Sequence, residues 1–307
     1  MTTEVLSFYL LDISSSFCLS AAHNVLFYTL DFHTPILHFL HFFVLFVVLF
    51  IVHLRKHTPI RRLNAHIFTV PVILQFIITL LSNRSHSQQR SGGLYLLRIF
   101  DFLTTVTVFV YGRSRKGKTH TWPGLGLLFP IAFGSSLSWL EFGILEYDSF
   151  GLLLSPILAI IRGIQIIHIQ ECFRMCAIKQ LDLFMLQFAG MCSAVLFPQA
   201  FYSWIHSSIS NDASWESIDY VLMCVSILFM AFYKYSEIWL QIALDARIYM
   251  VLEHTKYWMA SIGQNFIQNM AHACAYSFVG KLITLSALIR YAASYFEQNN
   301  NKREQKA

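Results

Sequence analysis

Stretches of about 20 mostly apolar residues, each long enough for a helix to cross a bilayer, recur from residue 5 to residue 296. A segment inside lipid must satisfy its backbone hydrogen bonds internally, which favours helices. We therefore expect an all-α polytopic membrane protein with about ten transmembrane helices. The short Asp245–Arg247 break between the eighth and ninth segments leaves nine spans as the alternative. The expected segments are residues 5–28, 35–54, 66–82, 93–112, 121–140, 148–168, 183–207, 218–241, 246–271 and 275–296.

The composition excludes an ordinary soluble protein. Of the 307 residues, 56% are hydrophobic and only 13% are charged, whereas soluble domains carry about 25% charged residues. No polar block is long enough to fold alone. We expect one integral domain over residues 1–297, with a first repeat at about 5–140 and a second at about 148–296, followed by a polar cytosolic tail at 298–307.

The basic residues lie in short connectors, a pattern typical of membrane topology and not of a nucleic-acid partner. With a cytosolic N-terminus, only Arg84 and Arg90 fall on the far side. This asymmetry predicts that both termini are cytosolic. No Lys or Arg precedes the first apolar run, so we expect that segment to be retained. The cytosolic connectors and tail hold Arg55, Lys56, Arg61, Arg62, Arg113, Arg115, Lys116, Lys118, Arg174, Lys179, Arg247, Lys302, Arg303 and Lys306.

Several charged side chains lie inside the apolar segments. Arg98 and Asp101 are three residues apart in the fourth segment, and Lys234 with Glu237 and Glu253 with Lys256 repeat that spacing. A charge at the bilayer centre costs about 2.5–3.5 kcal/mol on insertion scales, so such residues face other helices or water. Two interpretations stay open: closed ion pairs that hold helices together, or the lining of a transport path.

The placement of two cations favours transport. When ten spans are divided into two fives, Arg98 lies on the fourth span of the first half and Lys256 on the fourth span of the second. Many secondary transporters are inverted repeats whose equivalent helices meet around a midplane site. One cation from each half would form an anion site, and Lys and Arg both suit a phosphate compound.

Other polar residues are weaker candidates. Arg162 lies deep in the sixth segment, where it can serve a cavity or pair with Glu141. Tyr95 and Tyr257 can stack on a base or bond a sugar, although tyrosine also populates membrane interfaces. His168, Cys172 and Cys176 share a helix face but lack a fourth ligand, so we expect no metal. No nucleophile elbow, zincin motif, P-loop or dinucleotide fingerprint is present, so we expect no catalytic residues and no cofactor.

Short motifs suggest a family. The run Phe232–Leu240, followed by Lys256 twenty residues after Ser236, resembles the Ser-Glu-Phe-Leu-Leu to Lys block of nucleotide-sugar and triose-phosphate transporters. These form solute carrier family 35 of the drug/metabolite transporter superfamily, and the nearest subgroup is the GDP-fucose-transporter-like C branch. Further similar stretches are Phe32–Leu37, Ser82–Asn83, Leu94–Arg98, Glu141–Phe142, Phe150–Gly151, Ile161–Arg162 and Gly280–Tyr291.

This resemblance implies ten helices in a five-plus-five inverted repeat, located in a Golgi or endoplasmic-reticulum membrane. It implies exchange of a nucleotide sugar, or a related sugar phosphate, for a nucleoside monophosphate. Lys256 would be the phosphate-site lysine and Arg98 the first-half cation. The expected substrate-binding set is completed by Tyr95, Lys234, Glu237, Tyr257 and Arg162. The bilayer is a further partner, and a homodimer stays open.

Two positions depart from the family pattern. Triose-phosphate members follow the lysine with arginine, whereas this chain has Tyr257, which argues against small sugar phosphates. The family's Ser/Thr-rich turn before the lysine is replaced by Leu244–Arg247, and the family's cation there becomes Ala243, with Arg247 one helical turn on. The main alternative is therefore a degenerate, non-transporting member that acts as a membrane scaffold or regulator. A receptor or channel is a further alternative.

Overall fold

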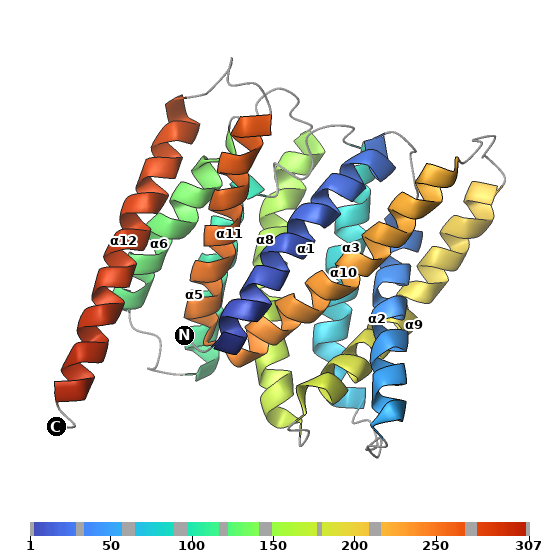
Figure 1. Cartoon of the computed structure of the whole chain (residues 1–307), viewed down its shortest axis with the longest axis horizontal. Coiled ribbons are helices and arrows are strands. Elements are labelled where there is room, and N and C mark those ends of the chain that lie inside the picture. Colours follow the sequence, from blue (N-terminus) through green and yellow to red (C-terminus); the bar gives the residue numbers. More distant parts are fainter. Residues whose placement is uncertain are drawn as a thin grey trace. The chain divides into compact units, whose positions relative to one another are not determined.

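The computed structural model describes residues 3–28, 34–56, 65–88, 98–116, 122–140, 149–176, 180–208, 216–267 and 275–304, and the regular elements within these ranges are helices. Ten long helices lie within these ranges (Figure 1), and most coincide with the expected apolar segments, the fourth segment being the main exception. They are α1 (Thr3–Tyr28), α2 (Thr34–Arg55), α3 (Ala65–Gln88), α5 (Phe102–Lys116), α6 (Trp122–Leu137), α8 (Ser149–Met175), α9 (Leu181–Ser208), α10 (Ser217–Ala243), α11 (Ala246–Ile267) and α12 (Ala275–Glu304).

Five of these helices are long and apolar enough to cross a membrane: α2, α3, α8, α9 and α10. Their outward side chains are large and apolar. Leu153 is 64% exposed and Phe197 is 51% exposed, which suits contact with lipid tails. The chain is thus an all-α protein of the integral membrane class.

The chain divides into two compact units that are not the two sequence halves. The first unit comprises residues 1–91 and 168–244, and the second comprises residues 92–167 and 245–307. The first therefore contains α1, α2, α3, α9 and α10, whereas the second contains α5, α6, most of α8, α11 and α12. Each unit combines helices from before and after the middle of the chain.

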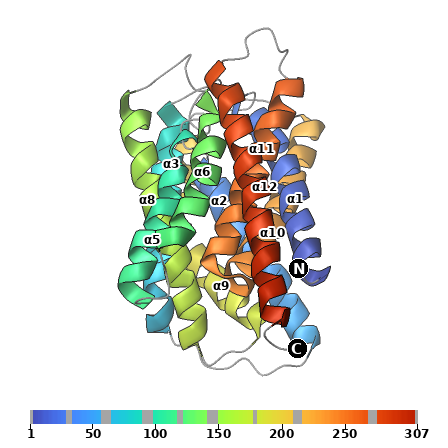
Figure 2. The same ribbon diagram turned by 90° about the vertical axis from the view of Figure 1, so that its left-hand side faces the viewer.

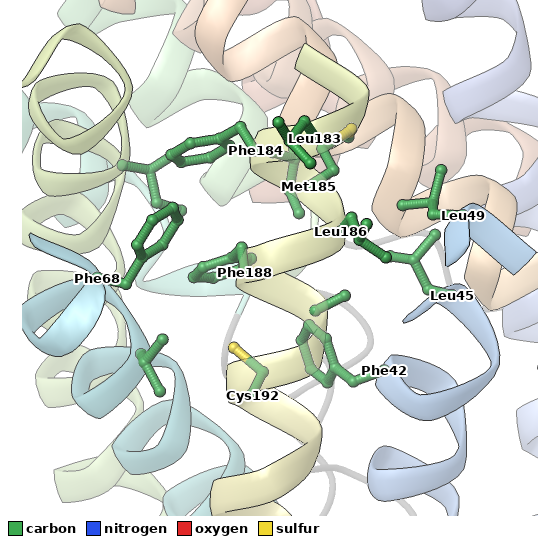
Figure 3. Close-up of a cluster of buried hydrophobic side chains, with 14 of the residues drawn as sticks. Phe42, Leu45, Leu49, Phe68, Leu183, Phe184, Met185, Leu186, Phe188 and Cys192 are labelled. Atoms are coloured by element: carbon green, nitrogen blue, oxygen red, sulfur yellow. The ribbon is translucent and has the colours of Figure 1, made fainter. Parts of the chain in front are cut away.

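In the first unit, α2 packs along α9 and α1 packs along α10. The core lies where aromatic side chains of α2, α3 and α9 meet, with Phe42, Phe68, Phe184 and Phe188 all buried (Figure 3). Gly190 brings α9 close to α2, because a Cβ there would lie 3.0 Å from two carbons of the Phe46 ring. Large rings on one helix therefore fill the space left by a small residue on the next.

In the second unit, α6 and α12 cross at a pair of glycines and lie side by side (Figure 2). A Cβ on Gly280 would lie 2.6 Å from the backbone nitrogen of Ser138, and one on Gly134 would lie 2.6 Å from Thr284 Oγ1. The Ser277 hydroxyl also donates to the Ser138 carbonyl at 2.8 Å. Small residues let helix backbones approach closely where lipid offers no hydrophobic driving force for association.

The fourth expected segment, 93–112, is not one continuous helix. Within the described residues, α5 begins at Phe102, and the backbone before it turns through contacts of the i to i+3 type, such as Asp101 N–H to the Arg98 carbonyl at 3.3 Å. At the start of α5, Asp101 Oδ1 accepts from Thr104 Oγ1 at 2.9 Å, and the Asp101 carbonyl accepts from the Thr104 N–H at 3.0 Å. The Phe102 N–H donates to Ser136 Oγ on α6 at 3.0 Å, so this helix start is satisfied inside the protein.

The expected break between the eighth and ninth segments is confirmed. α10 ends at Ala243 and α11 begins at Ala246, with Leu244 in an extended conformation between them. Arg247 Nε donates to Asp245 Oδ2 at 2.8 Å, which holds the connector. α10 and α11 are therefore two separate helices.

Candidate functional site

Charged side chains from three segments of the second unit converge on one place. The turn before α5 supplies Arg98 and Asp101, whose nearest charged atoms are 3.7 Å apart. The middle of α8 supplies Arg162, and α11 supplies Glu253. The predicted pairing of Arg98 with Asp101 is therefore confirmed, and a further cation joins it.

Arg162 links the two carboxylates. Its guanidinium lies 3.7 Å from Asp101 Oδ1, donates to Glu253 Oε1, and donates to the Tyr257 hydroxyl oxygen at 2.9 Å. The side chains of Asp101 and Glu253 are only 4% and 3% exposed, so both depend on these cations for compensation. The alternative partner proposed for Arg162, Glu141, lies outside the described residues.

Tyr257 lies at the centre of the cations. The Arg98 guanidinium carbon is 3.7 Å from the centre of its ring, Lys256 Nζ is 5.4 Å away, and the Arg162 guanidinium carbon is 5.9 Å away. The Tyr257 hydroxyl donates to Glu253 Oε1 at 2.5 Å. The negative face of an aromatic ring attracts cations, so this buried ring holds positive charges together without neutralising them.

We define the charge cluster as Arg98, Asp101, Arg162, Glu253 and Lys256 around Tyr257. Glu253 was predicted to pair with Lys256, but the partners that the structure gives it are Arg162 and Tyr257. The reason is geometric, because Arg162 approaches Glu253 from another helix with a planar donor group. Lys256 is itself buried, with 5% of its surface exposed.

Sequence reasoning missed His254, which lies beside the charge cluster on α11. Its Nε2 is 2.6 Å from Thr105 Oγ1 on α5, and its ring meets the Tyr257 ring edge-on at 6.2 Å. The Ser135 hydroxyl donates to the His254 carbonyl at 3.1 Å. The available signal was its position, next to Glu253 and three residues before Tyr257.

Lys234 and Glu237 belong to the first unit. The predicted pair is confirmed, with Lys234 Nζ donating to Glu237 Oε2 at 2.7 Å and the Tyr233 hydroxyl 3.4 Å from Glu237 Oε1. Ser236, which precedes Glu237, donates to Asp12 Oδ1 at 3.3 Å, and Asp12 is buried. Asp12 was also missed, although an aspartate within an apolar segment is itself a signal. Tyr95 lies outside the described residues.

Comparison with known proteins bears on the fold. No family model and no curated protein matches the sequence. A solved structure described as "Crystal structure of protein" is similar over 94% of this chain and 96% of its own, with a TM-score of 0.65 and 10% sequence identity. At that identity the likeness extends to the fold and not to the activity. The full-length match indicates that this arrangement of helices occurs in another protein.

Proposed function

We propose that this chain is a secondary transporter that exchanges a nucleotide sugar, or a related phosphorylated sugar, for a nucleoside monophosphate. The transport would take place across a Golgi or endoplasmic-reticulum membrane, with both termini in the cytosol. The nucleotide and sugar classes come from the family resemblance of the sequence. The site itself argues for a phosphate-bearing anion.

The observation that carries this proposal is the convergence of three cations on one buried tyrosine. Arg98, Arg162 and Lys256 come from three segments, and all lie within 6 Å of the Tyr257 ring centre. Holding like charges close together is costly, and a bound anion lowers that cost. A phosphate group supplies that charge and accepts several hydrogen bonds from guanidinium and ammonium groups.

The pattern of helix contacts supports a five-plus-five inverted repeat. If the ten helices are divided in chain order, α2 corresponds to α9 and α6 corresponds to α12, and both pairs pack extensively within their own units. The contact of α2 with α10 has its counterpart in that of α9 with α3. A substrate site near a discontinuous helix, such as the turn before α5, is typical of transporters with this symmetry.

Counterflow in reconstituted vesicles tests the proposal. Vesicles that contain the purified protein and are preloaded with GMP or UMP should take up a labelled nucleotide sugar from a broad panel, and Lys256→Ala should abolish uptake. Lys56→Ala is the matched control, because Lys56 is an exposed lysine that pairs with Asp182 in the first unit. No uptake of any panel member by the wild-type protein would refute transport of this class.

A non-transporting scaffold is the second candidate, favoured by one feature of the site. Both carboxylates of the charge cluster already engage Arg162, which is how a closed structural network would look. In that case the Arg98→Ala, Lys256→Ala double variant would still bind its protein partner. A transporter would lose nucleotide binding in the same variant.

A further inference from the structure

His254 is a buried histidine beside the charge cluster, and the proposed exchange does not by itself require a histidine there. The side chain is 3% exposed, and its Nδ1 makes no hydrogen bond within the described part of the chain. A buried polar nitrogen without a partner is costly and calls for an explanation. Histidine is also the side chain whose charge changes most readily near neutral pH.

The two ring nitrogens of His254 have different surroundings. Nε2 lies 2.6 Å from the Thr105 hydroxyl, and it donates to that hydroxyl or accepts from it according to the tautomer. In the described part of the chain Nδ1 makes no hydrogen bond. In either tautomer the neutral ring has one nitrogen that can take a proton.

The charged groups around His254 determine how favourable an added proton is. Among the described residues, the charged groups that act on His254 are Asp101 and Arg98 before α5, Arg162 on α8, and Glu253 on its own helix. Lys256 is also on α11, two residues away. α6 contributes the neutral Ser135, and α12 meets α11 where Trp258 donates to the Lys281 carbonyl. The charge cluster beside His254 therefore contains both cations and carboxylates.

A bound phosphomonoester dianion would add two negative charges next to His254, in surroundings of low dielectric where added charge is expensive. A proton on a neighbouring base offsets part of that charge. We propose that His254 takes up a proton when the charge cluster binds a phosphate dianion, so that anion and proton bind together. The proton comes from the solution, and no bond to phosphorus is made or broken.

This inference rests on the proposed function, since it needs an anion that binds to the charge cluster. Calorimetric titration of the purified protein with UMP, GMP or inorganic phosphate, in buffers of different ionisation enthalpy, counts the protons taken up. At about pH 8 the phosphate of the nucleotides is a dianion and an ordinary histidine is neutral. We expect about one proton per bound anion.

Two variants test whether His254 is the group that takes up the proton when the anion binds. His254→Gln retains an amide that reaches Thr105 but cannot titrate, so it should bind the anion more weakly and take up no proton. His206→Gln, a change at an exposed histidine of α9, should retain the wild-type count. If His254→Gln does not fold, His254→Asn replaces it. The number of protons taken up by the wild-type protein can be measured whether or not either variant folds.

The pH dependence of affinity gives a second readout. Binding that takes up a proton is stronger at low pH, so the wild-type Kd should increase up to about tenfold per pH unit above neutrality. In His254→Gln the Kd should stay flat over the same range. Binding without proton uptake, or unchanged uptake in His254→Gln, would overturn this inference and leave the proposed function standing. No binding of any of the three probes would overturn both.

Discussion

At the scale of the residue, Tyr257 has two chemically different roles. Its ring face lies against Arg98, with 3.7 Å between the guanidinium carbon and the ring centre. Its hydroxyl accepts from Arg162 and donates to Glu253. The hydroxyl thus gives a buried carboxylate one more hydrogen bond, whereas the ring attracts a cation without neutralising it. The two roles can be separated by mutation.

Tyr257→Phe should destabilise the protein while it retains the ring contact with Arg98. The variant leaves Glu253 and Arg162 each short of one hydrogen bond, which costs about 1.5–3 kcal/mol for bonds to charged groups. Equilibrium unfolding of the purified protein measures this loss. Tyr202→Phe is the control, because Tyr202 is 64% exposed, and it should change stability little. Equal stability of the two variants would show that the hydroxyl contacts contribute nothing.

At the scale of the element, the close approach of α6 and α12 depends on glycine. Gly280→Ala would place a methyl group 2.6 Å from the Ser138 nitrogen and 2.8 Å from the Gly134 carbonyl oxygen. Both neighbours are backbone atoms, so the helices must separate, and we expect a loss of about 1–3 kcal/mol in the free energy of unfolding. Gly126→Ala on α6 meets nothing within 4 Å and should instead stabilise the helix by up to about 1 kcal/mol. Thermal unfolding of both variants checks the opposite signs.

The helices themselves were largely predictable, because hydropathy over a bilayer-length window determines where they lie. The predicted start of α10 at residue 218 differs from the observed Ser217 by one position. The start of α5 was not predictable in this way. Asp101 is of a residue type that is favoured at helix starts, but it lies inside an apolar run whose composition alone favours a continuous span.

At the scale of the whole molecule, the partners that charged residues find on other helices could not be predicted from the sequence. Pairs within one helix follow from spacing, and Lys234 with Glu237 was predicted correctly. Arg162 and Glu253 are 91 residues apart, and they meet because α8 and α11 both contribute to the second unit. A pattern of apolar runs also does not predict which helices form each unit, because each unit joins segments that are distant in sequence.

Equilibrium binding of radiolabelled UMP or GMP to the purified protein tests the central claim that a phosphate-bearing anion binds at the charge cluster. We expect saturable binding by the wild-type protein and loss of most of that binding in Arg98→Gln and in Lys256→Gln. Binding should be unchanged in Lys56→Gln, the control at an exposed lysine. Either change removes a cation near Tyr257, so the affinity should fall at least about tenfold, the equivalent of 1.4 kcal/mol. Saturable binding that survives both cluster variants would contradict the account.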